Sequence, residues 1–273
     1  MYADSVNLMK QTIIHPMTAY EDGRKSTTDQ ALITEEPLSI RVDGNAYSVV
    51  MRTPGDEKAH AAGFCLAEGL IDSPADLVTI GSCTEDGTNV ATVTLTEARR
   101  ARVAGLLERK GFISQTSCGI CGKEVVDDIQ QITAPIAANH RFDVGRIMAC
   151  IDSLPHYQPL YRQTRSSHGA MILDEQLVVL GHAEDVGRHN AIDKAVGKVL
   201  MAETMDRAVL AVMSSRLSYE LVQKAARAGL EMIVGISRPT ALAVEVARSV
   251  NMTIACAKDD VLMIFCGEQR FIS

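Results

Sequence analysis

The last third of the chain alternates short apolar runs with amphipathic segments, and this alternation restricts the possible folds more than any other feature. The runs AVLAVM, EMIVGI and TIACA are typical of buried strands, and RLSYELVQKAARA and TALAVEVARSV between them have helical spacing. We expect Ser214 and Ser215 to cap the first helix, and Ser237 and Pro239 to open the second. Alternating strands and helices build a mostly parallel sheet layered with helices. The sequence therefore predicts an α/β domain over residues 143–273.

The preceding part of the chain predicts a different kind of unit. Residues 31–111 have the order ββαββα, with a hairpin turn at Asp43-Gly44-Asn45 and a basic amphipathic helix that ends at Gly111. This order is typical of a compact α+β domain. Residues 1–30 are polar and aperiodic, so we expect a loosely ordered lead-in, and residues 112–142 are expected to form a mobile cysteine loop and linker.

Composition narrows the class of protein. The 273 residues carry a formal net charge of −7, which argues against a mainly electrostatic nucleic-acid binder. No apolar run approaches the roughly 18 residues of a membrane span, and the first residues lack the pattern of a signal peptide. The seven cysteines have no disulfide-framework spacing. We therefore expect a cytoplasmic protein with reduced thiols, bound to neither membrane nor nucleic acid.

The segment Ser117-Cys118-Gly119-Ile120-Cys121-Gly122-Lys123 is the sharpest motif. Its glycines leave both sulfur atoms accessible, and a helix starting near Lys123 would help to lower a thiol pKa. The other five cysteines lie in apolar or periodic segments, and we expect them to be buried small hydrophobes; they are Cys65, Cys83, Cys150, Cys256 and Cys266. Cys118 and Cys121 are therefore the candidate reactive thiols.

Three chemical functions compete for this CxxC pair. A structural zinc site needs about four ligands, and no second CxxC supplies the others. A thioredoxin-like dithiol would follow a strand in a βαβ pattern, whereas this pair lies in an irregular stretch. A sulfur carrier needs only one accessible thiolate and a receiving pocket nearby. The sulfur carrier fits the sequence best.

A ligand site is expected where the strands of the α/β domain end, because open sheets of this kind bind ligands beyond the carboxyl ends of their strands. Three successive strands each deliver a cation to that edge, and their ends are Ser214-Ser215-Arg216, Ser237-Arg238 and Ala257-Lys258. Arg188 and His189 begin a predicted helix, whose first turn can also bind an anion. The cluster Arg165-Ser166-Ser167-His168 precedes another strand. These groups predict a cradle for phosphate.

His182 and Glu184 form an H-x-E pattern, which zinc deaminases combine with a downstream P-C-x-x-C. In this chain the CxxC lies upstream and has no proline before it. The pattern is therefore weak evidence for a zinc site, and we expect no resident metal.

Several motifs resemble those of one known family, the formate dehydrogenase accessory sulfurtransferases (FdhD/NarQ). They occur in the order EEPLSIRV, MRTPGDE, AEGLI, SCGICGK, EDVGRHNAIDK, RLSYELVQKAARAG and PTALAVEVAR, and they span about residues 31 to 250. The resemblance implies a homodimer that moves sulfur from a cysteine desulfurase to the bis(molybdopterin guanine dinucleotide) form of the molybdenum cofactor, which then enters formate dehydrogenase. It also implies a cytidine-deaminase-like, three-layer C-terminal domain without the deaminase zinc site.

The resemblance assigns roles to particular residues. Cys118 matches the persulfide carrier of the family, and Cys121 matches a cysteine with a supporting part. The stretch that contacts the cofactor's guanine nucleotide parts corresponds here to Ala257-Lys258-Asp259-Asp260-Val261-Leu262, where the family commonly has aromatic, basic and glycine residues. Two functions of other classes are alternatives to the sulfur carrier. One is a non-catalytic cofactor chaperone with a redox CxxC, and the other is a zinc-dependent nucleotide deaminase.

Overall fold

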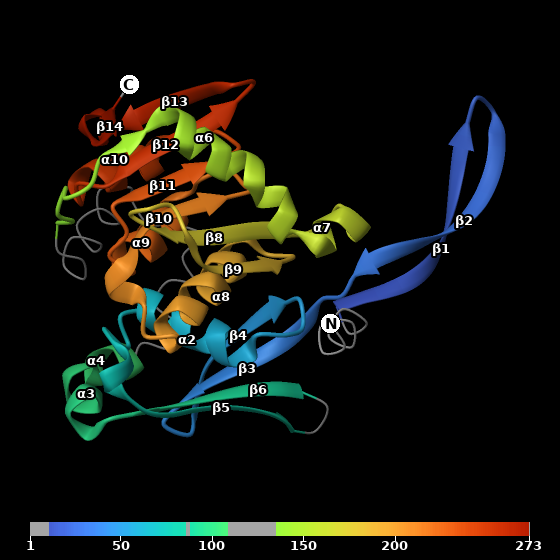
Figure 1. Ribbon diagram of the computed structural model, residues 1–273. Coiled ribbons are helices and arrows are strands. Elements are labelled where there is room, and N and C mark those ends of the chain that lie inside the picture. Colours follow the sequence, from blue (N-terminus) through green and yellow to red (C-terminus); the bar gives the residue numbers. More distant parts are fainter. Residues whose placement is uncertain (1–10, 86–87, 109–134, 273) are drawn as a thin grey trace.

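The computed structural model describes residues 11–85, 88–108 and 135–272. A six-stranded sheet with helices on both faces forms the main body, a smaller four-stranded sheet lies below it in Figure 1, and a two-stranded arm projects to one side. Within these residues, no helix is long and apolar enough to cross a membrane. The arrangement is mixed α/β, as the sequence predicts.

The large sheet has the strand order β13-β12-β11-β10-β8-β9. The bounds of its strands are β8 His168–Asp174, β9 Val179–Asp185, β10 Ala208–Met213, β11 Met232–Gly235, β12 Thr253–Lys258 and β13 Val261–Cys266. Only the β10–β11 and β11–β12 pairs are parallel, and the other three pairs are antiparallel. The expectation of a mostly parallel sheet is therefore wrong. Short turns join β8 to β9 and β12 to β13, and a short turn can connect only antiparallel neighbours.

Helices cover both faces of this sheet. One layer comprises α8 Arg188–Met201, α9 Tyr219–Arg227 and α10 Ala241–Ser249, and the other comprises α6 Val144–Ser153 and the 3₁₀ turn η2 Leu154–Tyr157. Helix α7 Pro159–Thr164 follows η2 and contacts strand β2 (Arg24–Ile33) of the arm. Two hydrophobic clusters result, one on each face of the sheet. Because both faces are buried there, the central strands β10 and β11 are continuously apolar rather than alternating. The same property made AVLAVM recognisable as a buried strand.

The N-terminal unit confirms the predicted ββαββα order. Its sheet has the order β4-β3-β6-β5, and the elements are β3 Glu36–Val42, β4 Asn45–Arg52, α2 Glu57–Ala67, η1 Pro74–Asp76, β5 Leu77–Glu85, β6 Thr88–Leu95, α3 Glu97–Arg102 and α4 Ala104–Glu108. The predicted turn is also confirmed, since Asp43 and Gly44 both adopt positive φ. The basic helix expected from residue 97 onward is divided in two at Val103.

Helices α2 and α8 join the two units at very close range. A Cβ on Gly197 would lie 1.8 Å from the carbonyl oxygen of Ala59, and one on Gly63 would lie 1.9 Å from that of Asp193. Glycine at both positions lets the backbones touch. One hydrophobic cluster then runs through both units without interruption. The domain boundaries given above remain predictions.

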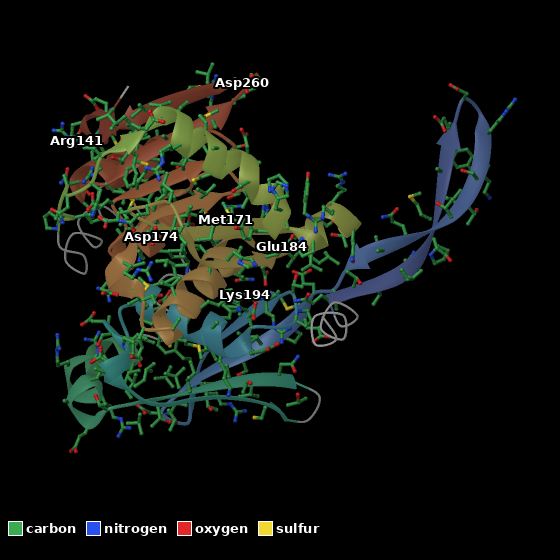
Figure 2. The ribbon with its side chains drawn as sticks, in the orientation of Figure 1. Arg141, Met171, Asp174, Glu184, Lys194 and Asp260 are labelled. Atoms are coloured by element: carbon green, nitrogen blue, oxygen red, sulfur yellow. The ribbon has the colours of Figure 1, made fainter. Side chains whose placement is uncertain are left out.

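A polar bridge spans the same junction. The buried Lys194 of α8 donates a 2.6 Å hydrogen bond to the carbonyl oxygen of Thr53, and its Nζ lies 2.7 Å from the buried carboxylate of Asp185. Asp185 also accepts a hydrogen bond from the Thr53 amide. Figure 2 shows Lys194 between the large sheet and the N-terminal unit. These residues of the EDVGRHNAIDK motif therefore hold the two units together.

The N-terminal segment differs from its expectation. β1 Thr12–Glu21 and β2 Arg24–Ile33 form an antiparallel hairpin instead of an aperiodic lead-in. Most of its side chains are exposed, so its sequence lacks the alternation that a packed face imposes. The turn at Asp22-Gly23, with both residues at positive φ, was the available signal, since Asp-Gly is a strong hairpin dipeptide. The remaining short elements are β7 Phe142–Asp143, η3 Met205–Arg207, η4 Glu268–Arg270 and β14 Phe271–Ile272.

Candidate functional site

Two adjoining cavities lie where the parallel strands end, and Ile236 belongs to the wall of both. Their volumes are about 390 and 320 Å³. Loops rather than helices form this edge, because α9 begins only after Ser218 and α10 only after its N-cap Thr240. The serines that the sequence assigned to helix starts lie in these loops instead. The strand ends thus converge as open α/β sheets require.

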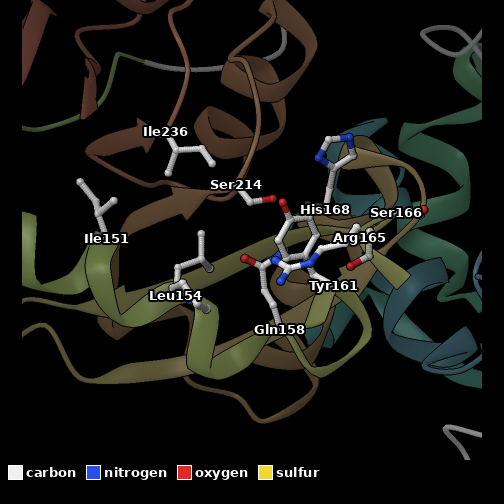
Figure 3. Close-up of a pocket in the computed structure, with 11 residues that line it drawn as sticks. Ile151, Leu154, Gln158, Tyr161, Arg165, Ser166, His168, Ser214 and Ile236 are labelled. Carbon is white, nitrogen blue, oxygen red and sulfur yellow. The ribbon is translucent and has the colours of Figure 1, made fainter. Parts of the chain in front are cut away.

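The first cavity opens between α6, α7 and the end of β10. It is lined by Ile151, Leu154, Pro155, Gln158, Tyr161, Arg165, Ser166, Ser167, His168, Ser214 and Ile236. Figure 3 shows an apolar end formed by Ile151, Leu154 and Ile236, and a polar end that gathers Arg165, His168 and Ser214. Such a combination suits a ligand with a flat apolar part and a polar or anionic part.

Strand pairing fixes the polar end of this cavity. The Ser214 hydroxyl accepts a 2.7 Å hydrogen bond from the Gly169 amide, and the Ser214 amide donates to the Gly169 carbonyl. His168 therefore stands beside Ser214 on the neighbouring strand. Burial lowers the pKa of His168, and the nearby charges of Arg188 and His189 lower it further. A neutral imidazole can donate or accept a hydrogen bond at neutral pH.

The second cavity is the more cationic one. It is lined by Ile236, Ser237, Arg238, Cys256, Lys258 and Met263. Arg238 and Lys258 come from successive strand ends and form part of one wall, which suits phosphate oxygens. Burial raises the pKa of the Cys256 thiol, although Arg238 acts in the opposite direction. Cys256 is therefore a poor nucleophile at neutral pH.

The other predicted anion-binding residues lie near the cavities without lining them. Arg188 and His189 form the first turn of α8, and their charges reach His168. His189 is engaged with α9, since its Nε2 lies 3.3 Å from Ser218 Oγ and 3.7 Å from Glu220 Oε2. Arg216 is exposed and lines neither cavity.

The stretch 257–262 forms the tip of the β12–β13 hairpin. Lys258 lines the second cavity, and the other five residues line neither of the two cavities described above. Asp259 and Asp260 make the turn, both at positive φ, and Figure 2 shows Asp260 at the far edge of the sheet from Glu184. Ala257 and Leu262 pack in the hydrophobic cluster under α6, and Val261 is exposed. A cofactor-binding role for these five residues remains a prediction.

Cys118 and Cys121 lie outside the described residues. Of the other five cysteines, Cys65, Cys256 and Cys266 are buried as expected, and Cys150 is partly buried. Cys83 is exposed on β5, so the expectation of burial is wrong there: β5 is the edge strand of the small sheet. Among the residues with described positions, no three His, Cys, Asp or Glu side chains gather as a metal site would require.

Sequence reasoning missed three residues that shape the first cavity. Gln158 and Tyr161 had no signal, because their segment lacks a motif and reaches the cavity only through the packing of η2 and α7. Glu184 stands out in the sequence only as half of an H-x-E pattern. In the structure it has a different role, since its carboxylate accepts hydrogen bonds from α7 and from Ser167.

Comparison with known proteins places the chain in a family. The model of the FdhD/NarQ family matches residues 33–272. The chain belongs to this family. A sulfur carrier protein FdhD from Xanthomonas campestris pv. campestris (strain B100) is 32% identical over 262 residues, which cover 95% of this chain and 92% of that protein. A protein of the same name from Streptomyces coelicolor is 35% identical over 259 residues, covering 91% and 92%.

A solved structure supports the fold of this FdhD/NarQ chain. The crystal structure of a putative formate dehydrogenase accessory protein from Desulfotalea psychrophila superposes with a TM-score of 0.77. It covers 96% of this chain and 100% of that one, at 22% sequence identity. The mixed α/β architecture with several sheets is therefore shared with that protein.

Proposed function

We propose that this chain is a sulfur carrier in the maturation of formate dehydrogenase. In this proposal Cys118 receives sulfur from a cysteine desulfurase and passes it to the bis(molybdopterin guanine dinucleotide) cofactor before the cofactor enters the dehydrogenase. The observation that carries the proposal is the 32% identity, over 95% of the chain, to a protein named as a sulfur carrier. The chain's CxxC pair supplies the chemistry that such a role needs.

The first step is a transfer between two thiols. The Cys118 thiolate attacks the terminal sulfur of the desulfurase persulfide, a new S–S bond forms on Cys118, and the desulfurase cysteine leaves as a thiolate. Four other cysteines are poorly suited to this attack, because burial raises the pKa of Cys65, Cys150, Cys256 and Cys266. Cys118, which the sequence predicts to be accessible beside Gly119, is the better candidate nucleophile.

The second step delivers sulfur to the substrate. Cys121 attacks the inner sulfur of the Cys118 persulfide, a Cys118–Cys121 disulfide forms, and the terminal sulfur leaves with the electron pair as hydrosulfide. With a proton from solvent, this hydrosulfide replaces an oxygen ligand of molybdenum, which leaves as water. The two thiols are oxidised and the transferred sulfur is reduced, so the metal keeps its oxidation state. A cellular thiol reductant then regenerates the CxxC pair.

The strand-end cavities are proposed to hold the nucleotide parts of the substrate. Arg238 and Lys258 suit its phosphates, and the first cavity offers Tyr161 and an apolar end to a base. The proposal includes a cytoplasmic homodimer with a cytidine-deaminase-like C-terminal domain, as the family resemblance implies.

Complementation separates the carrier from a chaperone that only binds the cofactor. In a cell lacking its own FdhD, Cys118→Ala is expected to leave formate dehydrogenase inactive while the purified variant binds guanosine diphosphate like the parent. Arg238→Gln is expected to weaken that binding while Cys118 still accepts sulfur. A Cys118→Ala protein that restores full activity would contradict the carrier and favour the chaperone.

A further inference from the structure

Glu184 ties together two walls of the first cavity without entering it. One carboxylate oxygen accepts a 2.8 Å hydrogen bond from the Leu160 amide. The other accepts a 2.8 Å bond from the Tyr161 amide and a 2.6 Å bond from the Ser167 hydroxyl. A single side chain of β9 therefore holds both α7 and the loop that leads into β8.

These bonds cap the N-terminus of α7. The first amides of a helix have no partner within the helix. Gln158 stands at the N-cap position of α7, but its side chain makes no capping bond. A carboxylate from another strand takes over this role, and negative charge at a helix start is electrostatically favourable. The first turn of α7 thus depends on Glu184 for its position.

The same two segments carry cavity-lining side chains. Tyr161 projects from the first turn of α7, and Ser167 belongs to the loop beside it. Arg165 follows the last residue of α7 with a left-handed backbone, and its guanidinium lies 5.3 Å from the centre of the Tyr161 ring. Figure 3 shows Tyr161, Arg165 and Ser166 together at the polar end of the cavity. A shift of α7 would therefore move this whole wall.

The partners of Glu184 also indicate that the H-x-E pattern has a structural role rather than a role in acid–base catalysis. Its carboxylate is engaged by three donors, which leaves it poorly placed as a general acid or base for a ligand. His182 packs against the Tyr157 ring at 4.9 Å between ring centres. Both residues of the pattern thus face η2 and α7.

We infer that Glu184 is a positioning residue, whose carboxylate holds the Tyr161 and Ser167 walls of the strand-end cavity in the arrangement that binds a nucleotide part of the substrate. The inference rests on the proposed function for the ligand, but the clamp itself rests only on the contacts of Glu184. In Glu184→Gln the side-chain NH2 group would face one of the donors that Glu184 accepts from, and that hydrogen bond would be lost. Glu184→Gln should therefore loosen the walls while leaving the side-chain volume unchanged.

The test combines hydrogen–deuterium exchange with binding of guanosine diphosphate. In the free protein, Glu184→Gln is expected to exchange faster than the parent at the Leu160 and Tyr161 amides, and Ser167→Ala to leave these two amides nearly unchanged. The dissociation constant for guanosine diphosphate is expected to rise about tenfold in Glu184→Gln and about threefold in Ser167→Ala. Glu245→Gln, on the exposed side of α10, is the matched control with no change.

The outcomes test the clamp, its role in ligand positioning and the proposed nucleotide binding separately. Unchanged exchange in Glu184→Gln would overturn the clamp, and faster exchange with unchanged affinity would overturn its role in ligand positioning. Loss of sulfur loading at Cys118 in the same variant would also overturn it, because the effect would then extend beyond the cavity. A parent protein that does not bind guanosine diphosphate would contradict the nucleotide part of the proposed function, while the exchange data would still decide the clamp.

Discussion

Replacing Lys194 by Met should destabilise the protein strongly, because it breaks a fully buried ion pair at the junction of the two units. Lys194 and Asp185 are 1% and 0% exposed, and Lys194 Nζ lies 2.7 Å from the Asp185 carboxylate. Removing Lys194 leaves the Asp185 charge buried without its counter-charge, although the Thr53, Gly187 and Asn190 donors remain. The loss of one partner of a buried ion pair costs about 3–5 kcal/mol. The Thr53 carbonyl also loses its 2.6 Å bond. A loss of this size is a large part of a typical unfolding free energy of about 5–15 kcal/mol.

A double-mutant cycle measures this effect by urea denaturation. Far-UV circular dichroism is the suitable probe, since the chain has no Trp. Asp185→Asn with Lys194→Met removes both charges, and the Asn oxygen can still accept the Thr53 amide bond. The Asn NH2 group then faces the Gly187 and Asn190 donors in the single and the double variant alike, so this cost cancels in the cycle. The double variant should therefore be more stable than the sum of the single losses predicts, by about 1–3 kcal/mol. A loss below about 1 kcal/mol in Lys194→Met, or strict additivity, would refute the reasoning.

Two further predictions concern helix packing and pH. Gly197→Ala should lower the unfolding free energy by about 1–3 kcal/mol, because its methyl group would clash with the Ala59 carbonyl. Gly105→Ala is the control and should have little effect, because the space around Gly105 is open. Equal losses of unfolding free energy in the two variants would contradict the close contact. Burial tends to raise the pKa of Glu220, but the side chains of His189 and Ser218 outweigh this and lower it to about 2. The lowered pKa means that Glu220 stabilises the fold above pH 4.5 and loses this contribution as pH falls toward 2. Urea titrations should therefore find Glu220→Gln less stable than the parent at about pH 6, with the difference shrinking as the pH approaches 2; a constant difference would refute the assignment.

Much of the fold was predictable because local patterns and tertiary packing agree. The buried strands β10, β11 and β12 and the helices between them follow from apolar runs and helical spacing alone. The turn at Asp174-Glu175-Gln176 predicts the β8–β9 hairpin, and this pairing is confirmed. The expectation of a mostly parallel sheet was wrong because periodicity says nothing of strand direction, so the antiparallel pairings of β8 with β10 and of β12 with β13 left no signal. The β1–β2 arm was missed for the opposite reason: it packs little, so burial leaves no pattern in its sequence.

The candidate site was predictable only where strand ends define it. Ser214, Arg238 and Lys258 were located by the rule that ligands bind beyond the strand ends, and all three line the cavities. The rule cannot foresee how a turn directs its residues, and Asp259 and Asp260 lie in a left-handed turn outside both cavity walls. The wall from α7 depends on contacts between distant segments, which sequence spacing does not encode.

The measurement that tests the account most directly is the intact mass of the protein after incubation with a cysteine desulfurase and cysteine, run beside Cys118→Ala. We predict that the parent gains one sulfur atom, that a reductant removes it, and that the variant gains none. A parent protein that gains no sulfur from an active, cognate desulfurase would contradict the carrier function, and so would a Cys118→Ala variant that gains as much sulfur as the parent.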